Sequence, residues 1–305
     1  MSLPRERLCL LAVHAHPDDE ASKGAATVHR YHSEGVHTVL VCCTGGEAGE
    51  ILNPAMDRPE IRENLHEVRM EELKRSTEVI GYDDVVMLGY RDSGMPDTPE
   101  NDDPACFARA DLSEAVGRLV EVIRRARPQV IITYADDQEG YPHPDHLRVH
   151  DISVVAFDAA GDPDVYPDAG GPWQASKLYY SAWSRARLLA MHETFLELGM
   201  ESPFDEKWFD RPHMDDRITT RIDVSDLDSI RRAALLAHAT QIDPESPFWG
   251  FSLPPDKVVY GTDDYIRARS LVDAPTPEED LFAGVRERVR SSAGPDRAGT
   301  NSEEQ

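Results

Sequence analysis

Two copies of one local pattern constrain the fold of this chain more than any other feature. An apolar run at Leu8–Val13 leads into His-Pro-Asp-Asp at 16–19, and a second run at Val130–Tyr134 is followed by His-Pro-Asp-His at 143–146. Both runs are short and unbroken, as expected for strands buried in a sheet. Proline suits the first position of a helix, since its φ is fixed and its nitrogen carries no hydrogen. The sequence therefore predicts two strand-to-helix turns with the same polar residues, the first opening a helix at Ser22–Glu34.

The alternation of strand-like and helical stretches predicts an α/β fold. We expect a Rossmann-like, mostly parallel sheet with helices on both faces. In the strand order 3-2-1-4-5, the first and fourth strands are neighbours at the point where the order reverses, and ligands bind at such points. The loops after these two strands carry the two His-Pro-Asp sequences. The topology thus offers a way to bring distant residues together.

The second half of the chain predicts a smaller, irregular α+β part. We place the Rossmann-like core at 1–165, a C-terminal part that completes the core and the substrate cleft at 166–290, and a polar, disordered tail at 291–305. A late strand is expected at Lys257–Tyr260. Most aromatic residues of this half are expected in the core, although some could line a substrate cleft: Phe204, Trp208, Phe209, Phe248, Trp249 and Phe251.

Charge and composition exclude several classes of protein. The chain has 32 Lys and Arg against 57 Asp and Glu, a formal charge of −25, which would repel phosphates and argues against nucleic acid or an anionic membrane as a partner. No apolar run approaches the roughly 20 residues that span a bilayer. The N-terminal residues do not resemble a secretory signal. The four cysteines show no CxxC spacing, so reduced thiols in a cytoplasmic protein are expected.

The residue types at the two turns favour a catalytic metal site over helix capping alone. An Asp before a helix is a common cap, but capping does not require His16 or two adjacent carboxylates. Imidazole nitrogens and carboxylate oxygens are ligands of zinc, and a set of three with an open position is typical of catalysis. The glycine-rich loop at 44–50 raises a nucleotide site as an alternative, yet the sequence contains neither GxGxxG after the first strand nor GxxxxGK[ST].

The AHPDDE and HPDH sequences resemble the zinc-dependent de-N-acetylases of the LmbE and PIG-L type. The resemblance runs from about Leu8 to at least Ile152 and extends to about residue 270. Within the family, the CTGGEAGEI, RDSGM and YPHPDHLRVHD stretches look most like the branch that cleaves the glucosaminyl amide of mycothiol S-conjugates. That reaction releases a mercapturic acid and glucosaminyl-inositol, and it serves detoxification. The alternative is deacetylation of N-acetylglucosaminyl-inositol in mycothiol biosynthesis.

The resemblance implies a metal site and a general base. His16, Asp19 and His146 would hold one Zn²⁺ per chain, and Fe²⁺ would also accept this ligand set. Asp18 would be the general base, since a carboxylate beside the metal can take a proton from the attacking water.

The same resemblance implies groups that act on the reacting amide. His143, as an imidazolium, would stabilise the oxyanion and protonate the leaving amine. Asp145 would orient the His143 ring and keep it charged. Tyr141 would donate a hydrogen bond to the tetrahedral intermediate.

The resemblance further implies the residues that bind the substrate, a small thiol conjugate of glucosaminyl-inositol. They are Lys23, Glu47, Arg69 and Asp92, with Lys23 expected near the thiol-bearing acyl part. Among the remaining histidines, His238 together with Gln241 is kept as a group that could close the site from the C-terminal half. A homo-oligomer remains compatible with the sequence.

Overall fold

The computed structural model describes residues 7–136, 141–254 and 257–292. Within these residues seven strands form one sheet in the order β3-β2-β1-β4-β5-β7-β6. Five strands run parallel to one another: β1 (Cys9–His14), β2 (His37–Thr44), β3 (Asp84–Tyr90), β4 (Val130–Tyr134) and β5 (Lys177–Ala182). Two antiparallel strands extend the sheet, β7 (Thr262–Ser270) beside β5 and β6 (Thr220–Asp223) beside β7. The expected order 3-2-1-4-5 is confirmed.

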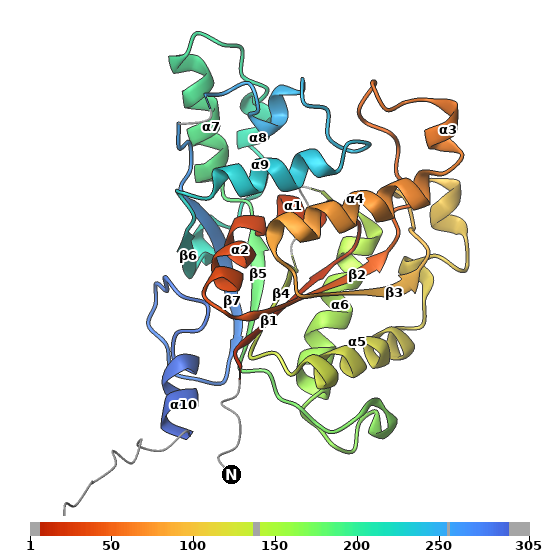
Figure 1. Cartoon of the computed structure of the whole chain (residues 1–305), viewed down its shortest axis with the longest axis vertical. Coiled ribbons are helices and arrows are strands. Elements are labelled where there is room, and N and C mark those ends of the chain that lie inside the picture. Colours follow the sequence, from red (N-terminus) through yellow and green to blue (C-terminus); the bar gives the residue numbers. More distant parts are fainter. Residues whose placement is uncertain (1–6, 137–140, 255–256, 293–305) are drawn as a thin grey trace, which may run out of the picture.

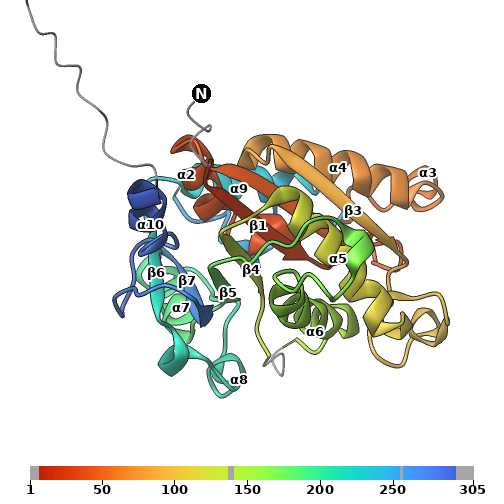
Figure 2. The same ribbon diagram turned by 90° about the horizontal axis from the view of Figure 1, so that it is seen from below.

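Helices cover both faces of the sheet (Figures 1 and 2). One face carries α1 (Asp19–Ser22), α2 (Ala25–Ser33), α4 (Leu65–Ile80) and α9 (Asp228–Ala237), and the other carries α5 (Leu112–Ala126) and α6 (Pro144–Ala159). Successive β1 side chains point to opposite faces. Leu11 and Val13 lie in the core cluster under α5 and α6, and Leu10 and Ala12 lie in the cluster under α2 and α9. Both faces of β1 are therefore buried, which explains its unbroken apolar run.

The described residues contain four further α-helices. They are α3 (Pro59–Arg62), α7 (Arg185–Glu197), α8 (Glu206–Phe209) and α10 (Val285–Ser292). Residues 291 and 292 end α10, and the rest of the expected tail, 293–305, lies outside the described residues. Among the helices that the structure describes, none is both long and apolar enough to cross a membrane.

The first helix differs from the expected Ser22–Glu34, because it is split into α1 and α2. Gly24 separates the two parts with φ of 101°, a conformation that glycine adopts without strain. A Cβ atom at this position would lie only 2.7 Å from the hydroxyl of Tyr265. The break leaves Lys23 at the C-terminal end of α1, where its ammonium group turns back to Asp19.

The expected strand at Lys257–Tyr260 is wrong; the described residues of that range are not in a strand, and the late strand is β7. The sequence did not predict β7 because Asp263 and Asp264 interrupt its apolar pattern. Both carboxylates are buried and satisfied: Asp263 accepts from Thr27 at 2.8 Å, and Asp264 accepts from Tyr260 at 2.8 Å. The distant Thr27 and the nearby Tyr260 thus allow a buried strand whose own residues do not predict it.

Candidate metal centre and active site

The turn after β1 holds Asp18 in a strained conformation. Its φ of 113° is outside the region that a non-glycine residue ordinarily adopts. The Asp18 N–H donates to the Glu20 carboxylate at 2.9 Å, and the Asp18 carbonyl accepts from the backbone N–H groups of Ala21 and Ser22 at 3.1 Å. The Asp18 side chain forms no capping hydrogen bond within the described chain, and pairs with Arg69 at 2.9 Å instead. Capping therefore does not explain this carboxylate.

The edge formed by the β1 and β4 carboxyl ends brings His16, Asp19 and His146 together. One Asp19 oxygen lies 3.4 Å from His16 Nδ1 and 3.5 Å from His146 Nε2. The candidate ligand atoms of the three residues lie within 4.8 Å of one another, and all three side chains are buried. The Tyr134 ring stacks on His146 with 4.4 Å between centroids. Two imidazole nitrogens and a carboxylate oxygen around one point fit a zinc or iron ion.

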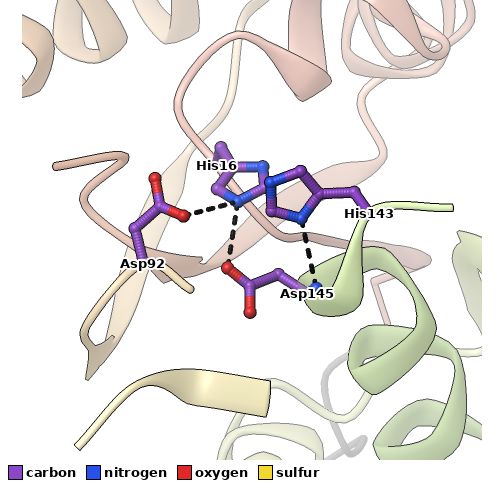
Figure 3. A group of neighbouring side chains, drawn as sticks. All are labelled: His16, Asp92, His143 and Asp145. Atoms are coloured by element: carbon purple, nitrogen blue, oxygen red, sulfur yellow. Dashed lines mark hydrogen bonds and ion pairs between the residues drawn. The ribbon is translucent and has the colours of Figure 1, made fainter. Parts of the chain in front are cut away.

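The far side of the His16 ring is held by carboxylates (Figure 3). Its Nε2 lies 3.1 Å from Asp145 and 3.5 Å from Asp92. With Nδ1 turned to Asp19 and Nε2 to Asp145, His16 has the arrangement in which an outer carboxylate orients a metal-binding imidazole. Burial opposes charging of His16, but hydrogen bonds to these carboxylates raise its pKa well above the usual value.

A second group that could hold a metal overlaps the first and consists of His16, Asp92, His143 and Asp145. Its carboxylates already accept hydrogen bonds from the chain. Asp145 accepts from the backbone N–H and hydroxyl of Ser93, and Asp92 accepts from the N–H groups of Gly94 and Ala48. Asp19 likewise accepts from the His16 N–H at 3.0 Å and from Lys23, so both groups are candidates for the ion, and the family resemblance favours His16, Asp19 and His146.

The expected contact between the Asp145 carboxylate and His143 is corrected by the structure. The Asp145 carboxylate binds His16 and Ser93, and only the Asp145 backbone N–H reaches His143, donating to Nδ1 at 3.2 Å. Burial, together with His16 and His146, lowers the pKa of His143 to about 4. The lowered pKa favours the neutral ring over the imidazolium that the resemblance implies, and the hydrogen bond that Nδ1 accepts from the Asp145 N–H favours a proton on Nε2.

Asp18 has the properties of a general base. Burial raises the pKa of Asp18 to about 6, with Arg69 opposing the shift and Asp19 adding to it. The Arg69 guanidinium is buried and donates to Asp18, to Gly46 O at 2.7 Å and to Pro17 O at 2.6 Å. This differs from the expected sugar contact of Arg69, since its terminal nitrogens already donate to protein oxygens. Arg69 therefore holds the Asp18 carboxylate in place.

The other expected substrate residues surround the same edge. Lys23 Nζ lies 2.5 Å from Asp19 Oδ1, and the Glu47 carboxylate accepts from the Asp92 N–H at 3.1 Å and lies 3.3 Å from His66. Asp92 is buried, whereas Lys23 and Glu47 are partly exposed. Tyr141 is 53% exposed, and its ring lies 5.3 Å from that of His146. Of these four residues, a substrate can reach Lys23, Glu47 and Tyr141.

A buried pair behind the turn, Glu20 with His238, gives His238 a different position from the one expected. His238, fully buried after α9, lies 2.6 Å from Glu20, which also accepts from the Ser76 hydroxyl. Glu20 in turn holds the backbone of Asp18. His238 thus supports the turn from behind and does not close the site, while Gln241 donates to Glu50 O at 3.0 Å. The position of Glu20 within AHPDDE was the only available signal; nothing in the sequence identified its partner.

Comparisons with known proteins identify relatives of this chain. The family described as PIG-L: GlcNAc-PI de-N-acetylase matches residues 11–157. The mycothiol S-conjugate amidase of Streptomyces coelicolor is 45% identical over 93% of this chain and 99% of its own length. The 1D-myo-inositol 2-acetamido-2-deoxy-alpha-D-glucopyranoside deacetylase of Geodermatophilus obscurus is 42% identical over 90% of this chain and 97% of its own length.

Among solved structures, the N,N'-diacetylchitobiose deacetylase from Pyrococcus horikoshii has a TM-score of 0.58 at 16% identity. The match covers 86% of this chain and 84% of the other, and it bears on the fold alone. The sequence identity to the two relatives, which extends over at least 90% of this chain, shows the family as well as the fold. The chain belongs to the PIG-L/LmbE family and is a hydrolase of amide bonds.

Proposed function

We propose that the protein is a zinc-dependent amidase that hydrolyses the glucosaminyl amide of mycothiol S-conjugates. The products would be a mercapturic acid and glucosaminyl-inositol, and the role would be detoxification. The S. coelicolor amidase supports this substrate, while the G. obscurus relative supports the alternative, deacetylation of N-acetylglucosaminyl-inositol. Four buried, unlinked cysteines are consistent with a reducing cytoplasm as the place of the reaction.

The observation that carries the choice of the amidase is the position of Lys23. The sequence resemblance implies that Lys23 lies near the thiol-bearing acyl part of a conjugate. In the structure the break at Gly24 turns its ammonium group to Asp19, at the edge where the amide must bind. An acetyl group has no atoms beyond its methyl for this side chain to contact, whereas a cysteinyl acyl group does.

The chain's own residues account for the reaction as follows. A zinc ion held by His16, Asp19 and His146 would act as a Lewis acid on the amide carbonyl and lower the pKa of water. Asp18, with its pKa near 6, accepts a proton from the water that adds to the carbonyl carbon. As the carbon–nitrogen bond breaks, Asp18 returns this proton to the leaving amine. His143 donates from Nε2 to the oxyanion, and Tyr141 adds a second donor.

A paired assay on the zinc-loaded protein tests the proposal. One sample contains the bimane conjugate of mycothiol, the other N-acetylglucosaminyl-inositol, and the free amine released is measured in both. We expect a much higher kcat/KM for the conjugate. Preference for the acetylated sugar would assign the protein to mycothiol biosynthesis, and inactivity on both with the metal bound would reject this substrate class.

A further inference from the structure

A pocket lies away from the candidate metal ligands, mainly in the C-terminal half of the chain. It is a hollow that opens to solvent, and the space between its walls, open solvent included, is about 770 Å³. Residues of α7 and α9, at the top of Figure 1, contribute to its wall, together with the turn at Pro247–Trp249 and the residue that follows β5. Its lining combines charged and apolar residues, and the apolar ones include Trp183, Met191, Phe248, Trp249 and Leu253.

The rings of this pocket form an ordered aromatic wall. Trp183 and Phe248 are stacked with an interplanar angle of 10° and 6.1 Å between centroids. Trp249 stands edge-on to both, at 6.3 Å from Trp183 and 5.0 Å from Phe248. All three rings are only partly buried. Partly exposed rings held in fixed orientation can add a further flat or apolar group to the stack.

The charges around the pocket are already paired with protein partners. Arg187 lies 2.9 Å from Asp263, Arg231 lies 2.9 Å from Asp228, and Lys257 lies 2.8 Å from Glu197. Arg232, the remaining cation of the lining, lies 4.0 Å from Asp228 and donates to the carbonyls of Gly250 and Phe251. A phosphate or carboxylate would have to compete with these contacts. The pocket therefore favours a neutral, apolar ligand.

The aromatic wall is connected to the metal centre. A smaller pocket shares Trp183, Arg187 and Asp263 with the larger one, and Lys23 also lines it. Lys23 contacts Asp19, the central carboxylate of the metal group. Trp183 also donates from its indole nitrogen to Ser22 O at 3.3 Å, which fixes its ring beside the break between α1 and α2. Lys23, which contacts Asp19, and Trp183, which belongs to the aromatic wall, therefore line the same small pocket.

We propose that this pocket binds the S-substituent of the conjugate and selects apolar, preferably aromatic, groups. The inference rests on the proposed amidase function and extends it. With the amide carbonyl at the metal centre, the Cα, Cβ and sulfur of the cysteinyl group lead past Lys23, and the group bound to sulfur enters the pocket. An acetyl substrate leaves the pocket unused, so it contributes to selecting conjugates over the acetylated sugar.

Two conjugates that differ only in the S-substituent test this assignment. We would measure kcat/KM for the bimane and the S-methyl conjugates of mycothiol with the zinc-loaded wild type, Phe248→Ala and Met191→Ala. The bimane-to-methyl ratio should fall about 10- to 30-fold in Phe248→Ala, because a stacked ring contact is lost, and a few-fold in Met191→Ala. The change should lie in KM, with kcat preserved.

Leu196→Ala is the matched control for Met191→Ala. Leu196 lies on the same helix, is 56% exposed and does not line the pocket, so the ratio should stay at the wild-type value. An unchanged ratio in both pocket variants would overturn this inference while leaving the amidase function intact. A wild-type protein that cleaves neither conjugate would overturn the amidase function, and the inference with it.

Discussion

The metal centre and the aromatic pocket differ in how firmly their residues are held. At the metal centre buried side chains contact one another across elements distant in sequence: Asp18 with Arg69, His16 with Asp145, Glu20 with His238. In the pocket, partly exposed rings lie on a short turn and at the end of a strand, and the surrounding charges are paired among themselves. The proposed reaction, which requires fixed positions, takes place at the edge of the parallel sheet. The proposed recognition of the substituent by its shape takes place in the irregular C-terminal half.

This comparison makes a general prediction about variants. A change at the metal centre should slow cleavage of every substrate by a similar factor, because all substrates share the amide. A change in the pocket should alter the ranking of substrates. The following variants test the first half of this statement, in order of decreasing effect.

His146→Ala should abolish both the metal site and hydrolysis of both substrates. It removes one of the three ligands and leaves Asp19 and His16 alone. Metal content by mass spectrometry and turnover of both substrates check it, with Leu147→Ala, on the exposed side of α6, as control. Stoichiometric metal and wild-type turnover in His146→Ala would place the ion elsewhere.

Asp18→Asn should reduce kcat by about 10²- to 10⁴-fold, the usual contribution of a general base, while the metal stays bound. The amide keeps the size of the side chain and removes its proton affinity. The reduction should be the same for the bimane and the acetyl substrate. Loss of metal together with activity would contradict the assignment of Asp18 as the base.

His238→Ala should destabilise the fold by about 3–5 kcal/mol, because the buried Glu20 carboxylate loses its charged partner. Burial opposes the charge on His238, but Glu20 raises its pKa, which supports an ion pair. Urea unfolding of the metal-loaded protein measures the change. A loss below about 1 kcal/mol would mean that Ser76 and the Asp18 N–H satisfy Glu20 without His238.

Asp145→Asn should weaken metal affinity or activity by about 10- to 100-fold, as expected for a group that orients a metal-binding imidazole. Competition with a chelator of known affinity measures the metal constant. The substrate ranking should not change. If metal affinity stayed at the wild-type value while kcat alone fell, Asp145 would act on the reaction through His143 instead.

The smallest expected effect is a shift in pH dependence. Asp18 acts when deprotonated, and its pKa is raised to about 6, so kcat/KM should rise with pH through about 6 and level off above it. Arg69→Gln removes a cation that favours the charged form, and should therefore move this limb to higher pH. The pH profile of kcat/KM at saturating metal, measured for the wild type and for Arg69→Gln, locates this limb in each protein. A limb that stayed in place or moved to lower pH would show that Arg69 does not act on Asp18 electrostatically.

The sequence predicted the parallel order and the edge that carries the site, because β1 and β4 are buried on both faces and end at specific polar motifs. It did not predict contacts that depend on the direction in which a side chain points. Asp145 was expected at His143, but its carboxylate points to His16. The pairing of Glu20 with His238 and the contact of the buried Asp263 of β7 with Thr27 join residues more than 200 positions apart in the chain. No local pattern contains that information.

A crystal structure of zinc-loaded Asp18→Asn with the intact bimane conjugate would test the division between chemistry and selection most directly. The account predicts the amide carbonyl beside His16, Asp19 and His146, the sulfur beyond Lys23, and the bimane ring against Trp183 and Phe248. The amide at the metal with the bimane ring directed away from this aromatic wall, for example towards Tyr141, would contradict it.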